Sequence, residues 1–186
     1  MSSPAHVAVL VGSLRKDSLN RKMAHALAAL APPDMKLSIV EIGDLALYNQ
    51  DLDGAPPASW TAFRDQIAKA DALLFVTPEY NRSVPGVLKN ALDVGSRPYG
   101  KSVFNGKPGA VVSVSPGAIG GFGANHHLRQ VLTFLNVPAM AQPEAYVGGA
   151  GDLFDDKGAI AKEATKTFLT GFMSAFAAWI AANRKG

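Results

Sequence analysis

The sequence predicts an α/β fold in which helices cover both faces of a parallel sheet. Apolar runs without alternation recur along the chain, and such runs are typical of strands that are buried on both faces. Each run is followed by a segment with apolar residues at helical spacing, which favours parallel strands joined by right-handed crossovers. With 186 residues and 48% apolar content, the chain is expected to form a single domain over residues 1–186.

The composition excludes several classes of protein. Cysteine is absent, which rules out disulfides, thiol nucleophiles and iron–sulfur ligation and is compatible with a reducing cytoplasm. The formal net charge is only +3 and no basic run exceeds two residues, so no nucleic-acid partner is expected. The uncharged stretch 167–183 is shorter than the roughly 20 apolar residues of a membrane span and is predicted to be a core-facing helix. We therefore expect a cytoplasmic protein without a membrane span.

The first strand is expected over residues 6–11, and the loop that follows it suits a phosphate. Ser18 is placed to cap a helix whose apolar positions begin at Leu19. Backbone N–H groups and the positive end of the helix dipole converge in such a loop, and Arg15 adds a charge that can engage two phosphate oxygens. The alternative is an ordinary strand-to-helix connection with a capped helix. The candidate phosphate-binding residues are Ser13, Leu14, Arg15, Ser18, Leu19 and Asn20.

A second strand is expected over residues 36–42, with the partial alternation of a strand near a sheet edge. The connection 43–57 is longer than usual, which indicates a functional segment or a contact with a partner. Its aspartates match no calcium-binding pattern, so no metal is expected there. Trp60, Phe63 and Ile67 then predict the second helix.

A third strand, residues 72–77, leads into a loop of polar and aromatic residues. Ser83 is expected to cap the next helix, with Pro85 in its first turn. The residues expected to line a site here are Pro78, Glu79, Tyr80 and Asn81. The later segment 95–102 matches the nucleotide P-loop pattern but follows a helix instead of opening one, so it is interpreted as a surface loop.

The fourth strand, residues 109–115, opens into a glycine-rich loop whose backbone amides can approach a flat ligand closely, although glycine-rich turns also occur without a ligand. Adjacent His126 and His127 do not face one another on the following helix, so they are not expected to bind a metal. Residues 137–140 are predicted to be a short fifth strand at an edge because of Pro138. The site residues expected from this loop are Ser115, Gly117, Gly120 and Gly121.

The predicted sheet order, 2-1-3-4-5, brings the three loops together. Ligands of such sheets bind outside the carboxyl ends of the strands, where the strand order reverses. One loop suits a phosphate, the second offers an aromatic ring, and the third offers amides for the edge of a planar ring. FMN fits all three, and no lysine or magnesium motif is needed because its phosphate is held and not transferred.

At these residues the sequence resembles the NADPH-dependent FMN reductase family, in particular its chromate and quinone reductase branch. The resemblance covers residues 7–137, whereas the C-terminal third carries little signature and Arg82 occupies a variable position. The matching motifs are Gly12-Ser13-Leu14-Arg15 with Ser18 and Asn20; Thr77 to Asn81 through Ser83 to Gly86 with Leu88 to Ala91; and Ser115 with Gly117, Gly120 and Gly121.

The resemblance implies a flavodoxin-like fold, tightly held FMN, and hydride uptake from NADH or NADPH, and our hypothesis for the mechanism is ping-pong. Electrons would pass to quinones, flavins, azo dyes or metal oxyanions such as chromate, and the protein would form dimers or tetramers. No side chain is expected to act as a catalytic acid or base, because the chemistry belongs to the flavin. Arg15, Arg82 and Lys101 are candidates for attracting anionic substrates by their local field.

Two other functions use a similar topology. A flavodoxin would carry electrons without a substrate site of its own, but the basic composition and the long connection 43–57 argue against it. A phosphorylated receiver domain needs an aspartate at the end of the third strand, where Thr77 and Pro78 stand instead.

Overall fold

The first four strands lie where the sequence predicted them, within two residues at each end. The computed structural model describes residues 3–184, so residues 1–2 and 185–186 of the expected unit lie outside the described part. The strands are β1 (Ala5–Val11), β2 (Met35–Val40), β3 (Ala72–Thr77), β4 (Gly109–Val114) and β5 (Ala145–Val147). The helices are α1 (Leu19–Leu30), α2 (Ala58–Ala68), α3 (Gly86–Ser96), α4 (Phe122–Phe134) and α5 (Glu163–Asn183).

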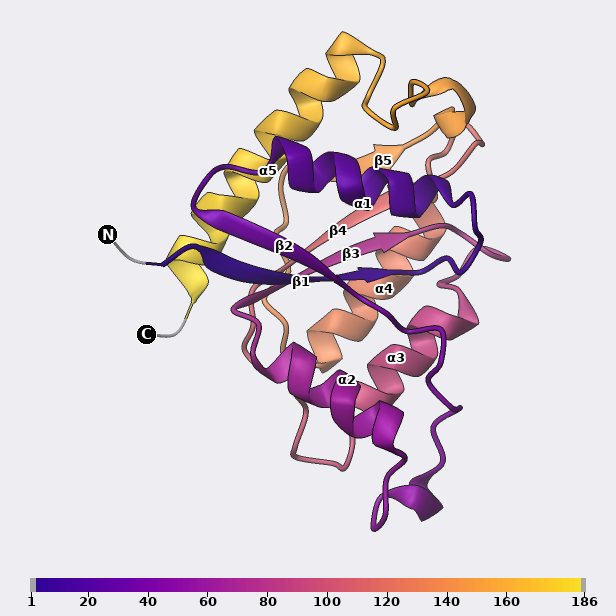
Figure 1. Ribbon diagram of the computed structural model, residues 1–186, viewed down its shortest axis with the longest axis vertical. Helices are drawn as coiled ribbons and strands as arrows, with labels where there is room; N and C mark the ends of the chain where they lie inside the picture. Colours follow the sequence, from indigo (N-terminus) through magenta and orange to yellow (C-terminus); the bar gives the residue numbers. More distant parts are fainter. Residues whose placement is uncertain (1–2, 185–186) are drawn as a thin grey trace.

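The five strands form one parallel sheet in the order β2-β1-β3-β4-β5, which confirms the predicted order. Helices α1 and α5 cover one face of the sheet, and α2, α3 and α4 cover the other (Figure 1). The result is the flavodoxin-like three-layer sandwich expected from the sequence. Every loop that leaves the carboxyl end of a strand therefore emerges at the same edge.

The central strands are almost entirely apolar because both of their faces are buried, and each contains one polar residue, namely His6 in β1, Thr77 in β3 and Ser113 in β4. In β1, Val9 packs in the layer of α1 and α5, whereas its neighbour Leu10 packs in the layer of α2, α3 and α4. All six residues of β3 and all six of β4 are buried. β2 lies at the edge of the sheet, and only its terminal residues, Met35 and Val40, are buried, which explains its partial alternation.

The fifth strand is Ala145–Val147, and the prediction that it lies at residues 137–140 is wrong. The earlier segment reaches the sheet only at the amino end of β4, through a single bridge between Ala139 and Gly109. Pro138 has no N–H to donate, and its carbonyl accepts from the Gly109 N–H at 3.1 Å. The chain then continues past Pro143 before a short strand pairs with Val112–Val114.

Two smaller expectations are also corrected. Ser83 does not cap α3, because the helix begins at Gly86 with Pro85 in the N-cap position and no side-chain cap. The stretch 167–183 was expected to face the core, but Phe168 within it is 41% exposed. The buried stripe of α5 includes Leu169 and Phe172, and successive positions on a helix turn by about 100°, which places Phe168 beyond its edge.

The long connection 43–57 is held by hydrogen bonds to α3, in the layer of α2, α3 and α4. The Tyr48 N–H donates to Asn90 Oδ1 at 2.8 Å, and the Asn90 side-chain amide donates to the carbonyls of Leu45 and Ala46. Within residues 3–184, no helix is long and apolar enough to cross a membrane. Over the same residues, no group of three or more histidine and acidic side chains is arranged to hold a metal ion.

Candidate cofactor site

The loops after β1, β3 and β4 meet at one hollow of about 250 Å³. They come together because these three strands are neighbours in the sheet. The hollow is lined by Ser13, Arg15, Ser18, Leu19, Asn20, Pro78, Glu79, Tyr80, Val114, Ser115 and Pro116. The convergence that the sequence predicted is therefore present in the fold, and most of the candidate residues lie on this one surface.

Several candidates from the same three loops do not line the hollow, namely Leu14, Asn81, Gly117, Gly120 and Gly121. Conversely, Val114 and Pro116 line it although the sequence did not single them out. Val114 ends a strand that is buried along its whole length, so its residue type gives no sign of a site. Only the position at the carboxyl end of β4 could have indicated it.

The first loop presents polar side chains that are almost fully buried. Ser13, Ser18 and Asn20 are only 3–4% exposed. Ser18 caps α1, as predicted, because its hydroxyl accepts from the Arg21 N–H at 3.2 Å. The Asn20 amide donates to the Val114 carbonyl at 3.3 Å, which fixes the orientation of its side chain toward the end of β4.

Asn20 also carries a buried oxygen that needs a donor. Its Oδ1 has no hydrogen-bond partner among the described residues. A buried polar atom without a partner costs free energy, so such an atom in a hollow marks a place for a ligand group. The ribityl hydroxyls of FMN are donors of this kind. The residues present therefore fit the sugar chain of the expected cofactor.

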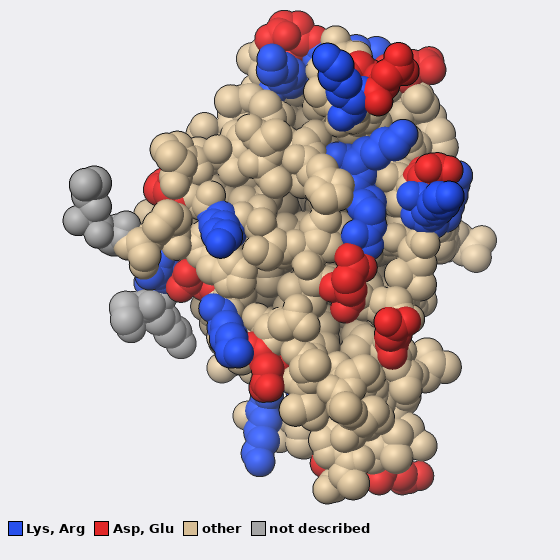
Figure 2. All heavy atoms as spheres, in the orientation of Figure 1, with Lys and Arg blue, Asp and Glu red and all other residues tan. Residues whose placement is uncertain are grey.

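The cations near this loop have different surroundings. Arg21 makes two hydrogen bonds with Glu41, at 2.8 and 2.7 Å, and these bonds hold the pKa of the Glu41 carboxyl below its usual range. Arg15 instead lines the hollow. Figure 2 shows Lys and Arg side chains interspersed with Asp and Glu on this face, and not gathered into one basic stripe. Within residues 3–184, Arg15 is thus the cation of the first loop that lines the hollow.

The second loop is a tight turn. The backbone N–H of Tyr80 donates to the Ser83 carbonyl at 3.1 Å, and the N–H of Ser83 donates back to the Tyr80 carbonyl at 3.0 Å. The two residues between them, Asn81 and Arg82, have φ angles of 52° and 63°. This conformation resembles the two-residue turn of a β-hairpin. It presents Tyr80, 49% exposed, at the wall of the hollow.

The third loop packs closely on β5. Gly120 has φ 63°, and a Cβ there would lie 2.6 Å from the Tyr146 carbonyl carbon, so only glycine fits. The N–H of Gly117 donates to Ser115 Oγ at 3.1 Å, and the N–H of Gly120 donates to the Gly117 carbonyl at 3.2 Å. The N–H groups of Gly117 and Gly120 are therefore already hydrogen-bonded within the loop. This reduces the number of backbone N–H groups in the loop that can contact the flavin as expected.

Of the three residues expected to attract anionic substrates, Arg15 lines the hollow, whereas Arg82 and Lys101 lie elsewhere. Arg82 lies at the tip of the second loop, where its Nη1 is 3.2 Å from Glu79 Oε1. Lys101 is not brought to this hollow. It follows α3, which carries the chain from the carboxyl end of β3 back to the amino end of β4, and the nearby Val103 N–H donates to Gly95 in the last turn of that helix.

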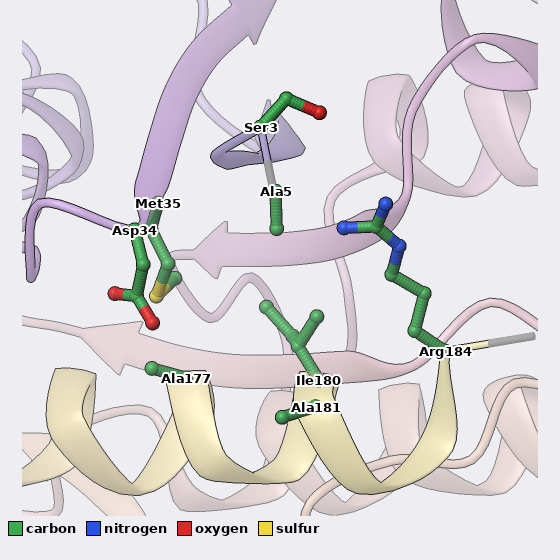
Figure 3. Close-up of a pocket in the computed structure, with 8 residues that line it drawn as sticks. All are labelled: Ser3, Ala5, Asp34, Met35, Ala177, Ile180, Ala181 and Arg184. Atoms are coloured by element: carbon green, nitrogen blue, oxygen red, sulfur yellow. The ribbon is translucent and has the colours of Figure 1, made fainter. Parts of the chain in front are cut away.

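A second hollow lies at the opposite end of the sheet (Figure 3). It has a volume of about 290 Å³ and runs between the amino ends of β1 and β2 and the last turns of α5. Small apolar side chains such as Ala177 and Ala181 form much of its lining, with Asp34 and Arg184 at its sides. Arg184 Nε lies 3.4 Å from Asp71 Oδ1.

Comparison with known proteins assigns the family. The model of the family described as NADPH-dependent FMN reductase matches residues 5–152. The chain belongs to this family. The matched range includes all three loops of the hollow and agrees with the resemblance stated from the motifs. Membership identifies an oxidoreductase whose cofactors are FMN and NADPH.

Similar proteins cover almost the whole length of this FMN reductase family member. A quinone reductase from Pseudomonas putida is 63% identical over 185 residues, 99% of each chain. A 2-hydroxy-1,4-benzoquinone reductase from a Burkholderia species is 53% identical over 174 residues, 94% of this chain and 95% of the relative.

Solved structures support the same relationship. FerB, a flavoenzyme NAD(P)H:(acceptor) oxidoreductase from Paracoccus denitrificans, superposes with a TM-score of 0.93 at 43% identity, over 97% of this chain and 100% of FerB. A flavodoxin from Pseudomonas aeruginosa superposes with a TM-score of 0.58 at 18% identity, over 95% of this chain and 99% of the flavodoxin. The second likeness is one of fold alone.

Proposed function

We propose that this chain is an FMN-dependent NAD(P)H:quinone oxidoreductase that works by a ping-pong mechanism. The observation that carries the proposal is a hollow shared by three loops, one of whose lining residues, Asn20, has a buried Oδ1 without a partner within residues 3–184. Quinone reductases are among the relatives with 63% and 53% identity, and this supports quinones as acceptors. FMN supplies the hydride-accepting and electron-donating chemistry when it is bound.

The residues of the hollow then have distinct tasks. Arg15 and the N–H groups at the start of α1 hold the phosphate, because a fixed positive charge and a helix N-terminus both favour an anion. Asn20 accepts a hydrogen bond from the ribityl chain, and Tyr80 borders the ring system. The bonded amides of the glycine loop keep that loop rigid, and Gly121 and its neighbours lie toward the ring edge.

Several finer properties belong to the same proposal. The donor is NADPH or NADH, since a relative from Pseudomonas aeruginosa with 40% identity is described as NAD(P)H-dependent. Chromate and other metal oxyanions are further acceptors, attracted by the cations at the rim, Arg15 and Arg82. The donor and the acceptor use the same open face in turn, which gives ping-pong kinetics.

The chain also forms dimers or tetramers and works in the cytoplasm, where its lack of cysteine is suited to a reducing environment. An exposed aromatic surface supports self-association. Tyr99 and Phe134 are 83% and 77% exposed, and they border one hollow beside the ends of α3 and α4. Size-exclusion chromatography with light scattering measures the oligomer, and cell fractionation measures the location.

The test of function begins with apoprotein and FMN. We expect stoichiometric binding, followed by steady-state oxidation of NADPH with a benzoquinone as acceptor. Double-reciprocal plots at several quinone concentrations are expected to be parallel, as a ping-pong mechanism requires. Absence of FMN binding would refute the proposal. Bound FMN that NADPH and NADH reduce only when a separate reductase is added would instead indicate a flavodoxin-type carrier.

A further inference from the structure

A carboxylate from one loop of the hollow caps the helix that follows another. Glu79 follows β3, and its Oε2 accepts a hydrogen bond of 3.0 Å from the backbone N–H of Ala124 in the first turn of α4. The N-cap residue of that helix is Gly121, which makes no side-chain cap. The first N–H groups of a helix need an acceptor, and a carboxylate is favoured there by the helix dipole. Glu79 therefore supplies the cap from a distant part of the sequence.

The contact requires a glycine on the helix. A Cβ at Gly123 would lie 2.9 Å from Glu79 Oε2 and 3.1 Å from the carbonyl oxygen of Arg82. The side chain of Glu79 is only 13% exposed. The second loop therefore packs against the first turn of α4 at Gly123, which has no side chain.

Two further contacts complete the attachment. Glu79 Oε1 lies 3.2 Å from Arg82 Nη1, so the two carboxylate oxygens are divided between the helix and the turn. Ser83 Oγ lies 2.7 Å from His127 Nδ1, one helical turn beyond Ala124. Between these contacts, Asn81 and Arg82 both adopt the left-handed conformation. Such conformations in non-glycine residues persist only where the surroundings enforce them.

We propose that Glu79 is a positioning residue, whose carboxylate clamps the turn 78–83 to α4 and so holds Tyr80 at the wall of the cofactor hollow. The carboxylate oxygens contact Ala124 and Arg82, and Glu79 acts on the hollow through the turn. Arg82 balances the charge of the clamp. The consequence for FMN rests on the proposed function, whereas the clamp itself does not.

The clamp is tested first without flavin, by amide hydrogen exchange of the apoprotein. We expect Glu79→Ala to increase the exchange rates of the Ala124 and Ser83 amides by about tenfold or more, because a hydrogen bond to a charged group is lost. Glu79→Gln retains an acceptor oxygen and is expected to rescue most of the protection. Asp93→Ala is the matched control, since it removes an exposed ion pair with Lys89 on α3. Equal exchange in wild type and Glu79→Ala would overturn the clamp.

The effect on the cofactor is then measured by quenching of flavin fluorescence. Glu79→Ala is expected to weaken FMN binding by about tenfold, with Glu79→Gln within about threefold of wild type. FMN affinity in Glu79→Ala equal to that in Asp93→Ala would overturn the positioning role. If wild type itself binds no FMN, the proposed function fails, while the exchange experiment still decides the clamp.

Gly123→Ala provides a second variant that leaves Glu79 in place, should Glu79→Ala fail to fold. Alanine in a helix is normally favourable relative to glycine, so without a clamp this variant is expected to stabilise the protein and to leave the exchange rates and FMN affinity unchanged. With the clamp, the added Cβ displaces Oε2, and the variant is expected to lose amide protection and FMN affinity as Glu79→Ala does. An unchanged affinity with unchanged exchange would overturn the proposal.

Discussion

The two ends of the sheet carry hollows of similar size, about 250 Å³ at the carboxyl end and about 290 Å³ at the amino end. The carboxyl end is lined by buried polar side chains, and one of their oxygens, Asn20 Oδ1, lacks a partner within residues 3–184. Alanine and isoleucine side chains line much of the amino end, and its arginine is beside Asp71. The comparison teaches that volume does not distinguish a ligand site. Unsatisfied hydrogen-bonding capacity, set beside a helix N-terminus, does.

The largest expected effect comes from adding a side chain where the third loop approaches the backbone of β5 closely, at Gly120. Gly120→Ala would place a Cβ 2.6 Å from the Tyr146 carbonyl carbon at φ 63°, and we expect a loss of about 2–4 kcal/mol in the free energy of unfolding, from overpacking and strain together. Urea denaturation of the apoprotein measures it.

The matched control is Gly158→Ala, which has φ 80° but open space around the added Cβ. It is expected to cost about 1 kcal/mol, from strain alone. Equal losses of stability in the two variants would show that the close approach of Gly120 to β5 adds nothing to the cost of the substitution. The close packing of the third loop would then not distinguish the carboxyl end from other parts of the molecule.

The next largest effect compares the arginine that lines each hollow, Arg15 at the carboxyl end and Arg184 at the amino end, by its effect on ligand binding. Arg15→Gln is expected to weaken FMN binding by about tenfold, because a charge-assisted contact to the phosphate is lost. Riboflavin has no phosphate, so its affinity is expected to be unchanged. Arg184→Gln makes the same change at the amino end and is expected to affect neither ligand. An equal loss for FMN and riboflavin in the Arg15 variant would contradict the phosphate assignment, and fluorescence titration distinguishes these outcomes.

A smaller effect is expected at Asn20. Replacing it with alanine removes the unpartnered oxygen together with one hydrogen bond to Val114, and we expect FMN and riboflavin to bind about fivefold more weakly. The two ligands share the ribityl chain, so their losses should match, unlike those of the Arg15 variant. A loss of affinity for FMN alone would indicate that Asn20 contacts the phosphate and not the ribityl chain.

The smallest effect concerns alkaline pH. Burial raises the pKa of Tyr146 to about 12, with a contribution from Glu144. A raised pKa in the folded state means that stability is fully present below the unfolded pKa, near 10, and is lost as the pH rises toward 12. Tyr146→Phe cannot ionise and is expected to lose stability more gradually over this interval. Thermal unfolding at pH 9 to 12 measures this, and identical profiles for the two proteins would contradict the assignment.

Much of the fold could be predicted because burial on both faces leaves a local trace. β3 lies at the predicted residues and β1 begins one residue earlier than predicted, since both strands are apolar along most of their length. β5 could not be predicted, because a three-residue strand has too few positions for a pattern, and the apolar segment 137–140 competed with it. Its place depends on pairing with β4, a contact between distant parts of the chain.

The site was predictable in outline for a related reason. Loops at the carboxyl ends of neighbouring parallel strands must share an edge, so three polar or glycine-rich loops implied one hollow. Lys101 was a candidate because of its charge and not because of its loop, and α3 carries it toward the opposite end of the sheet. Ser83 resembled a helix cap in sequence, yet its hydroxyl contacts His127 on α4.

The sequence alone determined the layered fold, the order of the strands and the cofactor class, because periodicity, glycine placement and family motifs are properties of short segments. The tertiary structure decided which polar atoms are satisfied. Asn20 is left with a free acceptor, whereas Glu79 is used by a helix that starts 43 residues later. Whether a side chain binds a ligand or its own protein depends on what lies within about 3 Å of it, and that distance is fixed only when the chain has folded.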